Sequence, residues 1–164
     1  MRMLFSAAIA ACVLTGCAPM AGPGTPPPAA PLSITYKTGA CFGACPVYSV
    51  TVDGSGSGTF EGERFTSSAG KQSFALTPAQ FDAFAGALAR FRPRGEKLVQ
   101  PGTPACGMAA TDMPGVDIVW REGGRTDHLN VYFGCDMEKN RAMFDALRVA
   151  PNALAIQGLI GAHS

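Results

Sequence analysis

The sequence predicts a single α+β domain in which an antiparallel β-sheet of hairpins packs against two or three helices and is braced by disulfides. Three observations support this fold class: short segments alternate apolar and polar residues, longer segments place apolar residues at helical spacing, and four cysteines lie beyond residue 31. A chain of 164 residues with a formal net charge of +1 suits one domain with its own core. Because it lacks a basic excess, no nucleic-acid partner is expected.

The first part of the domain is predicted to form an antiparallel meander. Tyr48, Val50 and Val52 alternate with more polar neighbours, as in a half-buried strand. A run of glycine and serine at residues 54–58 is typical of a hairpin turn and leads into the next strand. The strands expected in this part cover residues 32–37, 47–52, 59–63 and 71–76.

Helical spacing begins after the meander. Thr77 and Gln80 have the spacing of a capping box, and apolar residues then recur on one face as far as residue 91. Asp136 is a suitable N-cap for a second helix over residues 138–149, and a last short helix is expected over residues 151–159. These helices are expected to cover the sheet.

A second hairpin lies between the two main helices. The Gly-Gly pair at 123–124 is a two-residue turn signal, and counting back from it pairs Ile118 with Leu129. Residues 92–115 show no clear period, so a long loop is expected there, pinned by Cys106.

The start of the chain has the layout of an export signal. Arg2 is followed by an apolar run, and residues 14–17 resemble the cleavage box of bacterial lipoproteins. The resemblance implies that Cys17 becomes the first mature residue and carries acyl chains such as palmitate, which would anchor the protein in a membrane. The expected organisation is a signal peptide at 1–16, a lipidated cysteine and Pro/Gly/Ala-rich tether at 17–31, and a folded domain at 32–164.

The residue after the lipidation site bears on location. Residue 18 is alanine. An aspartate at this position would resemble a signal that retains lipoproteins in the inner membrane. We therefore expect a lipid-anchored protein of the bacterial cell envelope, on the outer membrane facing the periplasm in a Gram-negative cell.

The four cysteines of the domain are predicted to form two disulfides. An even number of cysteines outside the cytoplasm favours bridges, and four cysteines allow three connectivities. Cys41 and Cys45 are four residues apart, whereas Cys106 and Cys135 share the second half of the chain. This arrangement favours the pairs Cys41–Cys45 and Cys106–Cys135.

A polar group on the second hairpin is the candidate ligand site. The predicted register places His128 on the outward face of its strand, with Asp117 and Asn130 diagonal to it on the same face. Such a patch has the hydrogen-bonding groups to hold a ligand, although a histidine on a solvent-facing strand is more often simply solvated.

The segment from Ala40 to Tyr48 carries a Cys-Phe-Gly-x-Cys-Pro-x-Tyr motif. Together with Asp53-Gly54, Phe60-Glu61-Gly62 and the later Thr111–Pro114, it resembles the family named domain of unknown function 6438. The resemblance implies an exported bacterial protein, often a lipoprotein, and supplies no activity.

These observations predict a non-enzymatic envelope lipoprotein that binds a protein or an envelope polymer, with no cofactor, no metal and no catalytic residue. The alternative is a thiol-based redox or Cu(I)-handling protein that uses Cys41 and Cys45, because thiolates select Cu(I). The C-x₃-C-P spacing at these positions resembles that of copper chaperones of the thioredoxin-like class, in which a helix follows the motif. A strand is predicted to follow it here.

Overall fold

The computed structural model describes residues 31–161 as one α+β domain. The lipidation site Cys17, the signal peptide and residues 17–30 of the tether lie outside the described residues. Within residues 31–161, no helix is both long enough and apolar enough to cross a membrane.

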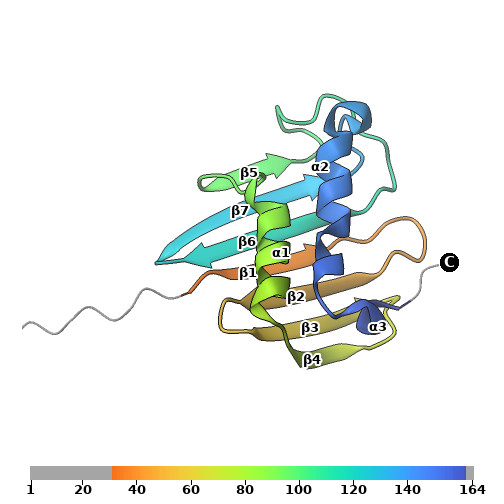
Figure 1. Cartoon of the computed structure of the whole chain (residues 1–164). Helices are drawn as coiled ribbons and strands as arrows, with labels where there is room; N and C mark the ends of the chain where they lie inside the picture. The colour runs from red at the N-terminus through yellow and green to blue at the C-terminus, as the bar shows by residue number, and fades with distance from the viewer. Residues whose placement is uncertain (1–30, 162–164) are drawn as a thin grey trace, which may run out of the picture.

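Seven strands form one sheet in the order β4-β3-β2-β1-β6-β7-β5 (Figure 1). The first four strands and the β6–β7 hairpin are antiparallel, and β1 joins the two parts by pairing with both β2 and β6. The strands are β1 (Ser33–Thr38), β2 (Val47–Asp53), β3 (Ser57–Arg64), β4 (Gly70–Ala75), β5 (Glu96–Val99), β6 (Gly115–Glu122) and β7 (Arg125–Tyr132).

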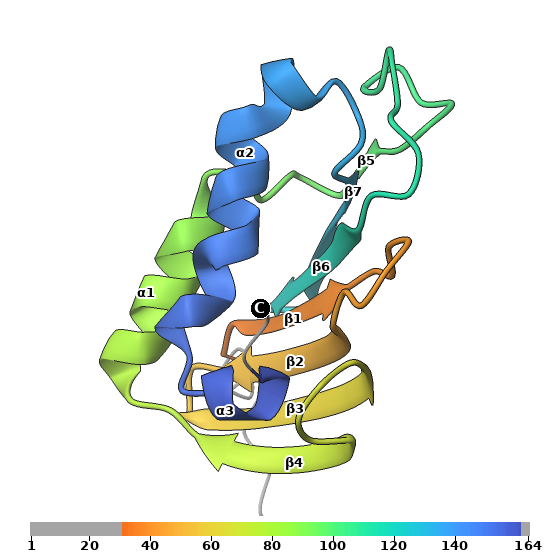
Figure 2. The ribbon, with the colours of Figure 1, turned by 90° about the vertical axis from the view of Figure 1, so that its right-hand side faces the viewer.

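Two helices, α1 (Pro78–Ala89) and α2 (Met137–Val149), lie side by side across one face of the sheet (Figure 2). The expected capping box starts α1, because the Thr77 side chain accepts from the Gln80 N–H and the Gln80 side chain accepts from the Thr77 N–H. The core between sheet and helices buries large side chains completely. The largest of these are Trp120, Tyr36, Phe60, Phe84 and Phe144.

The chain after α2 differs from the predicted continuous helix over residues 151–159. It forms one 3₁₀ turn, η1 (Ala150–Ala153), and a separate short helix, α3 (Gln157–Ile160). Leu154 separates them because its backbone is extended, with φ −95° and ψ 146°, and its side chain is buried.

Strand β5 was not predicted and makes the sheet mixed, because it pairs parallel with β7 at the edge. Its four residues carry no alternation, and only Val99 is buried. The residues of β5 therefore carry no alternating pattern that would predict a strand. The strand depends on contacts made by the segment that connects α1 to β5.

A buried ion pair fixes that connection. Asp127 faces the helices on β7 and is fully buried; its carboxylate accepts from Arg92 Nε at 2.7 Å and from the Gly95 backbone N–H at 3.0 Å. Arg125 adds a contact at 3.0 Å. The Gly95 bond, with help from the two arginines, lowers the pKa of Asp127 below its usual range. The pair thus holds the α1–β5 connection against the sheet.

Candidate functional site

The face of the sheet opposite the helices is left uncovered by any helix of the described residues, and we call it the open face (Figure 2). Side chains alternate along each strand, so the residues between the core positions point to this face. They are mostly polar or charged. Examples are Thr35 and Lys37 on β1, Ser49 and Thr51 on β2, and Glu61 on β3.

The structure brings the three predicted ligand-site residues together on the open face. The hairpin register pairs Ile118 with Leu129 and Asp117 with Asn130, as expected from the Gly-Gly turn. Asp117 Oδ2 accepts from Asn130 Nδ2 at 2.6 Å and lies 2.9 Å from His128 Nε2. The three side chains therefore form one hydrogen-bonded group on two adjacent strands.

Two further residues that sequence reasoning missed complete this group. Glu96 on β5 places Oε1 3.0 Å from His128 Nδ1, and Gln100, just after β5, donates from Nε2 to the side-chain oxygen of Asn130. We call Asp117, His128, Asn130, Glu96 and Gln100 the polar cluster. Parallel pairing of β5 with β7 sets Glu96 opposite His128. Because β5 was not predicted, the sequence analysis could not place Glu96 and Gln100 in this cluster.

His128 is held between two carboxylates. A neutral imidazole has one N–H, and ionised carboxylates only accept, so both ring nitrogens can donate only when the ring is protonated. The hydrogen bond to Asp117, reinforced by Glu96, accordingly raises the pKa of His128 above its usual value. The two carboxylates therefore favour the protonated His128 ring over the neutral one.

A hollow of about 360 Å³ adjoins the polar cluster where β1 ends and β6 begins. Its wall includes Asp117, Asn130 and Gln100 from the cluster, together with Lys37, Met113 and Tyr132. The Tyr132 hydroxyl donates to the Ala110 carbonyl at 2.9 Å and accepts from the Met113 N–H at 3.1 Å. The hollow therefore presents carboxylate and amide groups to a polar ligand, beside the Lys37 ammonium, which is paired with Glu63 at 2.7 Å.

The first disulfide joins Cys41 to Cys45 in the loop between β1 and β2, with the two Cα atoms 5.7 Å apart. Phe42 at the tip of this loop is 87% exposed. The Phe42 N–H donates to the Asp112 carbonyl at 3.1 Å, which ties the loop to the connection before β6. A strand follows the motif, as expected.

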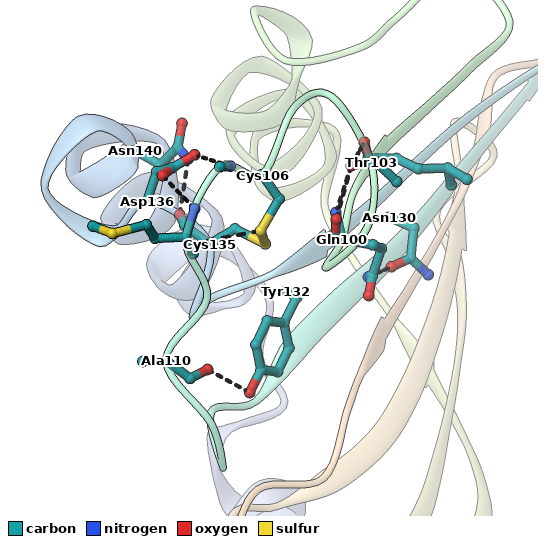
Figure 3. The surroundings of a disulfide bond; sticks show 12 residues. Gln100, Thr103, Cys106, Ala110, Asn130, Tyr132, Cys135, Asp136 and Asn140 are labelled. Atoms are coloured by element: carbon teal, nitrogen blue, oxygen red, sulfur yellow. Dashed lines mark hydrogen bonds between the residues drawn. A yellow bond between two sulfur atoms is a disulfide. The ribbon is translucent and has the colours of Figure 1, made fainter.

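The second disulfide joins Cys106 to Cys135 and pins the long connection to the start of α2 (Figure 3). Both sulfurs belong to the core. Asp136 differs from its predicted role, because its side chain makes no capping bond to its own helix and its φ is 41°. Its carboxylate accepts from the Gly107 and Met108 N–H groups at 2.7 and 2.9 Å instead, which lowers its pKa.

Within residues 31–161, no group of three or more histidine, cysteine, aspartate or glutamate side chains is arranged to hold a metal ion. In the polar cluster the two carboxylates lie on opposite sides of the His128 ring and bond its two nitrogens. The side chains of the cluster interact through hydrogen bonds and charge pairing.

Comparison with protein families places the domain in a known family. The model of a family described as a domain of unknown function, DUF6438, matches residues 32–150. No curated protein and no solved structure matches the chain.

Proposed function

The chain belongs to the DUF6438 family, and we propose that it is a lipid-anchored, non-enzymatic protein of the bacterial cell envelope that binds an envelope protein or polymer through the open face. The single observation that carries the proposal is the polar cluster, set on the open face beside a hollow. Four of its five side chains stand on paired strands, which hold them in place before a partner arrives.

The geometry supports binding in a specific way. The side chains of the polar cluster already hydrogen-bond to one another. A partner must therefore supply donors and acceptors that replace these hydrogen bonds or add to them. Lys37 and Tyr132 border the same hollow, so hydroxyl, amide and carboxylate groups all find a complementary neighbour there. Proteins and cell-wall polymers both carry such groups.

A binding experiment tests this proposal. The full chain, the Asp117→Ala/Asn130→Ala variant and a control, Thr59→Ala/Glu61→Ala on β3 of the same face, are mixed with isolated cell-wall polymer and separately with solubilised envelope proteins. We expect the wild type and the control to bind one of these fractions equally, and the Asp117/Asn130 variant to bind at least ten-fold more weakly. Equal binding by all three proteins contradicts the proposal.

The anchor is proposed from the sequence and has its own test. Cys17→Ala is expected to leave an unprocessed precursor without fatty acid, because the cysteine sulfur is the acceptor that the cleavage box implies. Metabolic labelling with palmitate measures this. Label that persists in the variant contradicts the lipoprotein assignment.

The thiol alternative is tested by the state of Cys41 and Cys45. Structural bridges have potentials below about −300 mV, whereas catalytic or regulatory bridges are more oxidising. We expect no free thiol in the purified protein and a low potential for this bridge. A potential near about −200 mV, or tight Cu(I) binding that Cys41→Ala/Cys45→Ala abolishes, replaces the binding proposal with the redox or copper function.

A further inference from the structure

A second cavity lies on the helix side of the sheet, apart from the polar cluster. It has a volume of about 270 Å³ and lies between the ends of β1 and β2 and the segment from α2 to α3. Its walls are mostly apolar and aromatic. They include Tyr36, Tyr48, Val116, Phe133, Pro46 and Ile160. We call it the α2 cavity.

Tyr48 gives the α2 cavity an unused hydrogen-bonding group. The side chain lines the cavity and is only 5% exposed, yet its hydroxyl has no hydrogen-bond partner within residues 31–161. Tyr36 beside it differs, because its hydroxyl donates to the Leu147 carbonyl at 3.0 Å. The Tyr48 hydroxyl is not fully enclosed, so water or a ligand in the cavity can hydrogen-bond to it.

Arg148 on α2 gives the cavity its charge. Among the lining residues that the structure describes, it alone is charged, and no carboxylate lines the wall. Its guanidinium carbon lies over the Phe133 ring, 4.4 Å from the ring centroid, and this contact holds the group at the cavity. One carboxylate outside the cavity, Asp145, reaches Arg148 Nη1 only at a long 3.4 Å on the exposed surface. Most of the guanidinium N–H groups are therefore available.

From these observations we infer that the α2 cavity binds a small carboxylate with an apolar body. The apolar body fills the aromatic walls, and the carboxylate pairs with Arg148, whose planar fork matches that group. The Tyr48 hydroxyl supplies a further donor for the same ligand. Arg148 is the single cation among the described residues that line the cavity, which suits a ligand with one negative charge.

The volume limits the size of the ligand. Pockets for drug-sized molecules span roughly 300–1,000 Å³, and the α2 cavity lies just below that range. A single ring with a short acid chain is therefore the expected scale. The α2 cavity adjoins the hollow of the open face, with which it shares wall residues at the end of β1 and the start of β6, but no residue of the polar cluster lines it.

The test uses 3-phenylpropionate and its neutral amide, 3-phenylpropanamide, which has nearly the same shape. Binding to the full chain is followed by calorimetry and by amide chemical shifts. We expect the acid to bind at least ten-fold more tightly than the amide, with the largest shifts at residues around Tyr48 and Arg148. Arg148→Gln should remove this preference.

Two more variants keep the outcome interpretable. Tyr48→Phe retains the ring and nearly the same volume, so this variant should fold normally. Its affinity for the acid should be severalfold lower than that of the wild type. Arg141→Gln removes a guanidinium from the same helix but outside the α2 cavity, and it should bind like the wild type. Equal binding of acid and amide, no binding of the acid at millimolar concentration, or shifts confined to the polar cluster would each overturn the inference.

Discussion

Removing the disulfide between Cys106 and Cys135 should destabilise the domain more than removing the one between Cys41 and Cys45. The perturbations are the two paired alanine substitutions, Cys106→Ala/Cys135→Ala and Cys41→Ala/Cys45→Ala. Each removes both cysteines of one bridge, so neither sulfur of that bridge is left behind.

The magnitude follows from the loops that the two bridges close. The bridges join residues 29 and 4 positions apart. In the chain-entropy treatment, which scales with the logarithm of loop length, these separations give about 3.6 and about 1.9 kcal/mol at room temperature. Cys135 is fully buried, so its truncation adds a cavity cost to the first figure. The difference between the variants should therefore be about 1.7 kcal/mol or more.

Urea unfolding of the wild type and the two variants, followed by circular dichroism, measures these free energies. Both variants should fold, and the Cys106/Cys135 variant should have the lower unfolding midpoint with a similar slope. Equal midpoints, or a lower midpoint for the Cys41/Cys45 variant, would refute the loop-closure reasoning.

Three further predictions concern buried or paired polar groups. The folded state raises the pKa of His128, so the stabilising contribution of the protonated ring is complete below the unfolded pKa of about 6.5. This contribution is lost as pH rises through the pKa of His128 in the folded state. The urea midpoint of unfolding should therefore fall between neutral pH and pH 9, and it should fall less in His128→Gln. The folded state lowers the pKa of Asp127, so the stabilising contribution of the ionised carboxylate is present above about pH 4 and is lost in acid. Asp127→Asn should therefore lower the melting temperature at neutral pH. The melting temperature of this variant should also fall less on acidification than that of the wild type. Tyr36→Phe should cost about 1 kcal/mol in urea unfolding because it leaves the Leu147 carbonyl unpaired, whereas Tyr48→Phe should be neutral or stabilising.

The hairpin around the polar cluster shows how far local sequence signals reach. The Gly-Gly turn fixes which residues of β6 and β7 face each other, and that register alone places His128 near Asp117 and Asn130. The same local logic predicts the meander and the capping box that starts α1. Each of these features depends on residues close together in the chain.

The missed features depend on contacts between distant residues. Glu96 joins the cluster only because β5 pairs parallel with β7, and a four-residue edge strand without alternation carries no sequence signal. Asp127 occupies an inward position of β7, where alternation predicts an apolar side chain. Asp127 can be buried because it pairs with Arg92, 35 residues earlier. Arg92 lies just after α1, and from that position alone the sequence would predict a cation that interacts with the end of the helix. Asp136 likewise finds its partners 28 and 29 residues away.

Photo-crosslinking in living cells tests the central claim, that the open face is the binding surface. A photoreactive amino acid replaces Val119, which faces outward opposite His128, or Asp145, which is exposed on α2 across the domain. We predict crosslinked adducts from position 119, lost when Asp117→Ala and Asn130→Ala are added, and none from position 145. Adducts from position 145 alone, or adducts from position 119 that survive those two substitutions, would contradict the claim.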